Sequence, residues 1–221
     1  MRDEELRRFI PQLPRVPGIQ GRHRYFNSAV IIPLLWQQSE YHLLFQVRAK
    51  EIRQGDEICF PGGAFDADLD ESFTETALRE TEEELGLDRS QVEVIGRLDT
   101  LVVPMGTAIE PHLGLLNVTD LSELRPDPRE VARIFTLPVS YFREHDPEVY
   151  SVRVEVHPVH VDDHGQERVL LPAAKLGLPE RYHAPWGGKE MPIFVYQTQE
   201  GVIWGMTAEL LRDLTRYLRL F

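Results

Sequence analysis

The segment Arg79-Glu80-Thr81-Glu82-Glu83-Glu84-Leu85-Gly86-Leu87 places four glutamates within five consecutive residues. The sequence around this segment predicts a helix over residues 73–85. Ser72 and Glu75 form the S-x-x-E capping box that opens many helices, and Gly86 stands where a left-handed residue commonly ends one. The acidic segment is therefore predicted to form the second half of a helix whose two ends are well defined.

Three of these glutamates share one face of the predicted helix. At 100° per residue, Glu80, Glu83 and Glu84 fall within an arc of about 100°, beside the stripe that packs on the core. Like charges at these spacings destabilise a helix, and so does their position near its negative end. A divalent cation would reverse both effects, and carboxylate oxygens are ligands that Mg²⁺ and Mn²⁺ prefer. The alternative is an acidic helix face that simply meets solvent.

The order of residues along this helix resembles the Nudix box, which is written G-x5-E-x7-R-E-U-x-E-E-x-G-U with U an aliphatic residue. The matching residues are Glu71, Arg79, Glu80, Glu83, Glu84, Gly86 and Leu87. Two positions depart from the pattern, because Thr81 holds an aliphatic position and Phe65 stands where the first glycine is expected. Gly62-Gly63 come earlier, and the loop ahead of the helix would absorb the two extra residues without moving the carboxylates.

The resemblance implies a fold, a reaction and residue roles. The implied fold is α/β, an α/β/α sandwich with a mixed sheet in which the box forms a loop-helix-loop. The implied reaction is Mg²⁺- or Mn²⁺-dependent hydrolysis of the diphosphate bond of a nucleoside diphosphate derivative. Glu83 and Glu84 would bind the metal, and Glu80 would be a third ligand or a base toward the attacking water. The resemblance further implies an orienting role for Arg79 through Glu71, and a metal contact from the backbone carbonyl of Gly63.

The stretch Leu43–Gly63, upstream of the helix, resembles the signature of the coenzyme A diphosphatase branch of the Nudix superfamily. The matching residues are Arg48-Ala49, Arg53, Gly55 and Phe60-Pro61-Gly62-Gly63. One residue fewer separates Arg53 from Phe60 than in the commonest form of the signature. The segments Glu130-Val131 and Ile203–Ala208 also resemble that branch. Coenzyme A is therefore the implied substrate, with 3',5'-ADP and 4'-phosphopantetheine as products.

Four residues of this stretch are predicted to contact the substrate: Arg48, Arg53, Phe60 and Gly62. Guanidinium groups hold phosphates through paired hydrogen bonds, so the two arginines would offset the acidic surroundings. The alternatives are that each arginine lies on the surface and that Phe60-Pro61 only forms a turn. Glu130 is either a fourth metal contact or a carboxylate at a strand edge. Trp186-Gly187-Gly188 is either a lid over the substrate or an anchor for a long loop.

The remaining segments predict one α/β domain over residues 1–221. Residues 1–22 are expected to form an N-terminal arm, and 143–192 a family-specific insertion. A short helix is expected after Pro138, and a closing amphipathic helix over 207–220. Strands are predicted, from apolar runs and from alternation, over 28–35, 41–48, 92–98, 112–118, 131–139, 150–161, 193–196 and 202–204.

Composition narrows the functional classes. The net charge of −12 would repel nucleic acid, and no apolar stretch reaches the roughly 18 residues of a membrane span. The single cysteine, Cys59, cannot form an intramolecular disulfide. We expect a cytoplasmic enzyme with a small-molecule substrate and no nucleic-acid or membrane partner, for which a homodimer is one option.

Two other functions compete with hydrolysis of coenzyme A. One is a Nudix hydrolase of another nucleoside diphosphate derivative, such as ADP-ribose or a dinucleotide. The other is a catalytically silent Nudix domain that senses a ligand. The intact set of Glu80, Glu83 and Glu84 argues against the silent domain, because a sensor has no need of crowded carboxylates.

Overall fold

The large sheet is organised around strand β1 (Phe26–Gln37) in the computed structural model, which describes residues 2–220. β1 lies parallel to β7 (Thr107–Leu116) and antiparallel to β2 (Glu40–Arg48). Gln38 and Ser39 connect β1 to β2, and both have left-handed backbone angles (φ 50° and 69°). That conformation is typical of two-residue hairpin turns, because its twist matches that of the strands. The hairpin predicted from the sequence is confirmed.

Eight of the described strands form this sheet, which is mixed because one of its pairs is parallel. Its central order is β3-β2-β1-β7-β5, while β4 pairs with β1, β6 with β7, and β8 with β2. The other strands of this sheet are β3 (Ile58–Cys59), β4 (Gly62–Ala64), β5 (Val92–Arg97), β6 (Leu101–Val103) and β8 (Val131–Pro138). Two smaller sheets, ordered β13-β12-β9 and β10-β11, comprise β9 (Glu148–Val156), β10 (Val159–Val161), β11 (Glu167–Val169), β12 (Trp186–Thr198) and β13 (Gly201–Trp204).

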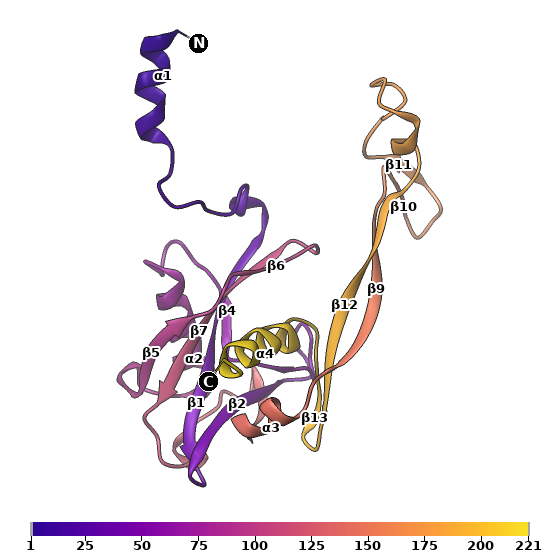
Figure 1. Ribbon diagram of the computed structural model, residues 1–221. Helices are drawn as coiled ribbons and strands as arrows, with labels where there is room; N and C mark the ends of the chain where they lie inside the picture. The colour runs from indigo at the N-terminus through magenta and orange to yellow at the C-terminus, as the bar shows by residue number, and fades with distance from the viewer. Residues whose placement is uncertain (1, 221) are drawn as a thin grey trace.

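Helices pack on both faces of the large sheet (Figure 1), and each interface has its own apolar core. The α-helices are α1 (Asp3–Phe9), α2 (Phe73–Leu85), α3 (Val139–Glu144) and α4 (Gly205–Leu218). Single 3-10 turns are formed by Ile10–Gln12, Arg22–Arg24, Arg89–Gln91, Leu121–Glu123 and Glu180–Tyr182. Side chains of β1 alternate between the two cores, since Ile31 packs in the α2 core and Ile32 in the α4 core. The fold is the expected α/β sandwich of helix, mixed sheet and helix.

Helix α2 has the limits that the sequence predicts, Phe73 and Leu85. The Ser72 hydroxyl accepts a hydrogen bond from the Glu75 backbone N–H (3.3 Å), and Gly86 ends the helix with a left-handed φ of 63°. Thr81, which departs from the aliphatic pattern of the box, is fully buried. Its hydroxyl donates to the Ala77 carbonyl (2.7 Å), so burial leaves no unsatisfied donor.

Two segments extend from the body of the molecule (Figure 1). The antiparallel pair β9 and β12 forms a long ribbon that ends in β10 and β11, and α1 lies apart from the sheets at the end of an N-terminal segment. The predicted strand over 150–161 is interrupted at His157-Pro158, and β12 begins at Trp186, well before the predicted 193. Within residues 2–220, no helix is long and apolar enough to cross a membrane.

Candidate functional site

A cavity of about 490 Å³ lies between the second half of α2, the β3–β4 segment and the start of α4. It brings together residues that are distant in the sequence. Some belong to the predicted metal ligands of the acidic helix, and others to the predicted substrate contacts upstream of it. The predicted residues that line it are Arg48, Arg53, Phe60, Gly62, Gly63, Glu80 and Glu84. Arg79 and Glu83 do not line it. The acidic helix and the upstream signature thus meet at one cavity.

Glu84 is the most deeply buried of the helix carboxylates, with 2% of its surface exposed. Burial, together with the nearby negative charge of Glu80, raises the pKa of the Glu84 carboxyl to about 7. The Gly62 N–H donates to Oε2 of Glu84 (2.8 Å) and partly offsets this effect. Gly62 has φ 150°, and a Cβ atom there would lie 2.3 Å from the Ala29 carbonyl oxygen. Glycine is therefore required where the chain bends to present this donor.

Glu80 lies one helical turn before Glu84 and is partly open to the cavity, with 17% of its side chain exposed. Burial raises the pKa of the Glu80 carboxyl, and the negative charges of Glu83 and Glu130 raise it further, while Arg79 lowers it. A Cβ atom on Gly63 would lie 2.3 Å from Oε2 of Glu80. The Glu80 carboxylate can lie against the backbone at position 63 only because that residue has no side chain.

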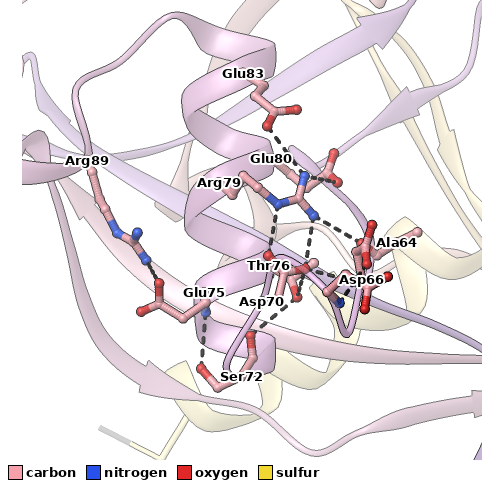
Figure 2. Close-up of polar contacts among 11 residues, drawn as sticks. Ala64, Asp66, Asp70, Ser72, Glu75, Thr76, Arg79, Glu80, Glu83 and Arg89 are labelled. Atoms are coloured by element: carbon pink, nitrogen blue, oxygen red, sulfur yellow. Dashed lines mark hydrogen bonds and ion pairs between the residues drawn. The ribbon is translucent and has the colours of Figure 1, made fainter.

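Arg79 is held by carboxylates on two sides (Figure 2). Its Nε donates to Oδ1 of Asp70 (2.9 Å) and its Nη2 to Oδ2 of Asp70 (3.0 Å). Its Nη1 donates to Glu80 (2.8 Å) and lies 3.5 Å from Oε1 of Glu83. The prediction that Arg79 acts through Glu71 is wrong, because the bidentate partner is the buried Asp70 and Glu71 is exposed.

The loop before α2 explains this change of partner. The Asp70 carboxylate also accepts hydrogen bonds from the Thr76 hydroxyl (2.9 Å) and the Asp66 N–H (3.0 Å). The Arg79 hydrogen bonds hold the pKa of the Asp70 carboxyl well below its usual range. Phe65, which replaces the expected glycine, packs its ring 4.6 Å from that of Phe73. The sequence did not indicate Asp70 as the partner of Arg79, because the motif specifies only the spacing of residues along the chain. The conformation of the loop determines which of the two adjacent carboxylates points inward.

The two predicted arginines lie beside each other at the cavity. Nε of Arg48 donates to the Arg53 carbonyl (3.0 Å), and both side chains are in the cavity lining. Phe60 has only 3% of its surface exposed, and its ring stacks on that of Phe45 with centroids 5.0 Å apart. The structure therefore gives Phe60 mainly a core role at the cavity wall. Trp186 lies on the ribbon, outside the cavity lining, and packs edge-on against Tyr182 (5.4 Å).

Three further residues also belong to this region, although the sequence indicates no role for two of them and leaves the role of the third open. Glu130, for which two roles were open, lines the cavity with Glu80 and Glu84. Burial, followed by the charge of Glu84, raises the pKa of the Cys59 thiol to about 11, so this thiol stays protonated at neutral pH. The Gln46 amide is fully buried beside Cys59 and Glu84, and it lowers the pKa of both groups. No sequence motif marks Gln46, because its position beside these groups comes from tertiary packing.

The carboxylates fit a hard cation whose coordination is completed by other ligands. Among residues 2–220, no three His, Cys, Asp or Glu side chains converge closely enough to hold a metal by themselves. Mg²⁺ usually keeps several waters and takes one or two protein carboxylates together with substrate phosphates. Glu80 and Glu84, both with raised pKa values at one cavity, supply that number. A bound cation would offset the effects of burial and like charge that raise these values.

The fold and this cavity define an α/β protein equipped to handle a phosphate group beside clustered carboxylates. Residues 25–160 match the model of the NUDIX domain, which is more than half of the chain. The chain belongs to the Nudix family. It is a Nudix hydrolase, and its substrates are nucleoside diphosphate derivatives.

Relatives share this assignment. The chain is 37% identical to the peroxisomal coenzyme A diphosphatase NUDT7 of Mus musculus over 140 residues, 62% of this chain and 57% of that protein. It is 30% identical to the uncharacterized Nudix hydrolase NudL of Photorhabdus laumondii over 213 residues, 96% of this chain and 95% of the relative. A crystal structure of a MutT/nudix family protein from Enterococcus faecalis aligns with a TM-score of 0.47 at 13% identity, covering 99% of this chain and 70% of that chain.

Proposed function

We propose that this Nudix hydrolase cleaves the diphosphate bond of coenzyme A or a coenzyme A derivative, giving 3',5'-ADP and 4'-phosphopantetheine. The observation that carries the proposal is the shared cavity, in which Arg48 and Arg53 lie with Glu80 and Glu84. The mouse relative is a coenzyme A diphosphatase, which supports the same substrate. The alignment spans just over half of that protein, so its activity is carried over here only as a proposal.

Some residues of the cavity would bind the substrate, and others would bind the metal that takes part in the reaction. Arg48 and Arg53 would hold substrate phosphates through charge-assisted hydrogen bonds, offsetting a chain whose net charge is −12. Glu84, Glu80 and the Gly63 carbonyl would hold Mg²⁺ or Mn²⁺, with Glu83 approaching from the helix surface. The cation supplies a Lewis acid at the phosphate oxygens.

The bond changes are those of hydrolysis. The oxygen of a water molecule would join one phosphorus atom, and the bridging oxygen would leave with the other phosphate. Glu80 would either accept a proton of that water or add a metal ligand. Asp70 would act indirectly, because it fixes the Arg79 guanidinium that donates to Glu80. Arg79 is therefore proposed as a positioning residue rather than one that touches the substrate.

A substrate panel tests the proposal. Coenzyme A, 3'-dephospho-coenzyme A and ADP-ribose would be incubated with Mg²⁺ or Mn²⁺, and the products separated by liquid chromatography with mass detection. We expect coenzyme A to have the highest kcat/KM and to release 3',5'-ADP. Faster turnover of ADP-ribose than of coenzyme A would refute the coenzyme A assignment and leave the Nudix hydrolase assignment intact.

The two arginines can be separated in the same assay. Arg48→Ala or Arg53→Ala removes a charge-assisted contact worth about 1.5 to 3 kcal/mol, which corresponds to roughly a ten- to hundredfold loss of kcat/KM. An arginine that binds the 3'-phosphate will show a larger loss with coenzyme A than with the 3'-dephospho form. An arginine that binds the diphosphate will show equal losses with both. Unchanged kcat/KM in both variants would remove these residues from the substrate contacts.

The proposal also includes the cellular location and the oligomeric state of the protein. A cytoplasmic location stays a prediction, and the peroxisomal location of the mouse relative is a property of that protein. A homodimer also stays a prediction, which sedimentation analysis of the purified chain would test.

A further inference from the structure

The cavity that contains Glu80 and Glu84 extends along the sheet to the first residues of β1. Phe26, Ser28 and Val30 alternate along this strand, so their side chains lie on one face, and all three line the cavity. Val30 also packs against the α4 core, which identifies this face as the one that α4 covers. The sheet itself therefore forms the floor of the cavity at this end.

Strand pairing places this floor directly beside the carboxylates. Ser28 lies opposite Ala64 of β4. Ala64 follows Gly63, and the Glu80 carboxylate lies against the backbone of that glycine. Phe26 comes two residues before Ser28, which is about 7 Å along an extended strand. A substrate whose diphosphate lies at Glu80 can thus reach Phe26 with the next part of its structure.

Phe26 presents its ring at the open end of the floor, with 51% of its surface exposed. Its backbone is fixed, because its N–H donates to the Gly106 carbonyl (2.7 Å) and the residue lies opposite Thr107 of β7. Met105, in the turn between β6 and β7, also lines this end and is 75% exposed. A fixed and half-exposed aromatic ring at the rim of a ligand cavity is a platform on which a flat group can stack.

The chemistry of this end favours an aromatic base over a chain of amides. Phe26, Ala64 and Met105 line it without a hydrogen-bonding side chain. The Ser28 hydroxyl already donates to a backbone carbonyl of β7 (3.5 Å). An amide-rich chain would find few partners here beyond the Thr107 hydroxyl, and unpaired polar groups are costly to remove from water. The faces of a purine ring need no such partners, and the polar edge of the ring can stay in solvent at the open end.

We propose that Phe26 stacks on the adenine base of the coenzyme A substrate and that the floor between Phe26 and Glu80 holds the ribose. This inference rests on the proposed function, because the diphosphate of the same molecule would lie at Glu80 and Glu84. Phe26 thereby determines how tightly the 3',5'-ADP half of the substrate binds, and it contributes little to the binding of the other half. It takes no part in the bond changes.

The two reaction products separate the two halves of the substrate. Isothermal titration calorimetry with Mg²⁺ would give the dissociation constants of 3',5'-ADP and of 4'-phosphopantetheine for the parent enzyme and for Phe26→Ala. We expect the dissociation constant of 3',5'-ADP to rise roughly 5- to 150-fold in the variant, which corresponds to the 1 to 3 kcal/mol that stacking of a base on an aromatic ring contributes. The dissociation constant of 4'-phosphopantetheine should stay within about twofold of the parent value, because that half lacks the base.

Two further substitutions at Phe26 distinguish stacking from packing. Phe26→Trp keeps an aromatic face and should bind 3',5'-ADP within about threefold of the parent. Phe26→Leu keeps a large apolar side chain without the ring, and it should lose most of the affinity that Phe26→Ala loses. Trp36→Ala is the matched control, because Trp36 is an exposed aromatic residue (57%) on the same face of β1, at the far end of the strand. It should leave both dissociation constants unchanged.

Three results would overturn the inference. Equal losses for the two products in Phe26→Ala would show that the substitution disturbs the whole cavity. A loss confined to 4'-phosphopantetheine would place the other half of the substrate at Phe26, and unchanged dissociation constants in all three Phe26 variants would remove this residue from the site. The proposed function is tested separately by turnover, since it fails if the parent enzyme does not release 3',5'-ADP from coenzyme A.

Discussion

Two buried carboxylates, one just ahead of α2 and one within it, lie in opposite electrostatic environments. Asp70, ahead of α2, is buried but receives two hydrogen bonds from Arg79 and others from Thr76 and Asp66. Glu84, in the last turns of the same helix, is buried with one backbone hydrogen bond from Gly62 and a like charge nearby. The pKa of Asp70 is lowered, and that of Glu84 is raised to about 7.

This difference between Asp70 and Glu84 distinguishes a carboxylate that stabilises the fold from one that is suited to bind a cation. A buried charge with a full set of partners stabilises the fold in its ionised form. A buried charge that its partners compensate only in part favours the neutral form, and perturbed groups of this kind occur often at functional sites. Removing the charge should therefore have opposite effects on stability at Asp70 and at Glu84.

The largest effect is expected for Glu84→Gln, which keeps size and removes the charge. We expect kcat to fall on the order of a thousandfold or more, because an electrostatic ligand of the reacting centre is lost. The metal-free protein should instead become more stable at pH 8, by about 1 to 3 kcal/mol, because the folded variant no longer buries an ionised carboxylate at position 84. Steady-state kinetics and urea unfolding measure the two quantities.

Glu82→Gln is the matched control for that variant. Glu82 lies on the exposed face of the same helix, so its replacement should change both quantities little. A Glu84→Gln variant with nearly full activity would contradict the assignment of this carboxylate to the site.

The opposite sign is expected for Asp70→Asn. This substitution leaves the Arg79 guanidinium without its bidentate partner, and breaking such a buried pair costs about 3 kcal/mol. Activity should fall as well, because Arg79 also donates to Glu80. Urea unfolding at pH 7 provides the measurement, and Glu71→Gln is the neighbouring control with an expected change below about 0.5 kcal/mol. A larger loss at Glu71 than at Asp70 would reinstate Glu71 as the partner of Arg79.

A smaller effect is expected where the backbone approaches Glu80. In Gly63→Ala the new Cβ atom would lie 2.3 Å from Oε2 of Glu80, so that the flexible end of that side chain must move. We expect kcat to fall about ten- to hundredfold, as is usual when support for a metal ligand is disturbed. The free energy of unfolding should change little.

Gly96→Ala is the control for this glycine, because no heavy atom lies within 4 Å of a Cβ atom there. Equal kinetics for both alanine variants would show that the Glu80 carboxylate tolerates displacement.

The periodic parts of the sequence predicted the fold well. The limits of α2, the β1–β2 hairpin, β5 and β8 followed from capping residues and apolar runs, because local chemistry determines those ends. The ribbon was harder to predict. β12 contains Gly187-Gly188 and Pro192, residues that usually mark loops, but pairing with β9 extends the strand through them.

The site was predictable where residue spacing determines geometry and unpredictable where tertiary packing does. The positions of Glu80 and Glu84 follow from the helical period. The exposure of Glu83, the burial of Gln46 and the selection of Asp70 over Glu71 depend on a loop and on neighbouring strands. A sequence motif specifies the spacing of residues along the chain, and it contains no information on whether Asp70 or Glu71 points inward.

The smallest effect concerns the pH dependence of stability in the metal-free protein. The pKa of Glu84 is about 7 in the folded state and 4.5 in its ordinary range, so the folded chain binds the additional proton between these values. Stability should therefore fall as pH rises from about 5 to 7, with a slope of up to roughly 1 kcal/mol per pH unit. Asp70 acts in the opposite direction, because its lowered pKa stabilises the ionised fold and that contribution is lost only as pH falls below about 4. Urea unfolding between pH 5 and 8 in the presence of a chelator measures the slope, and Glu84→Gln should reduce it strongly while Asp70→Asn leaves it unchanged. Glu80, whose pKa is also raised, can leave a residual slope in Glu84→Gln, but an undiminished slope in that variant would show that the contrast between the two carboxylates is wrong.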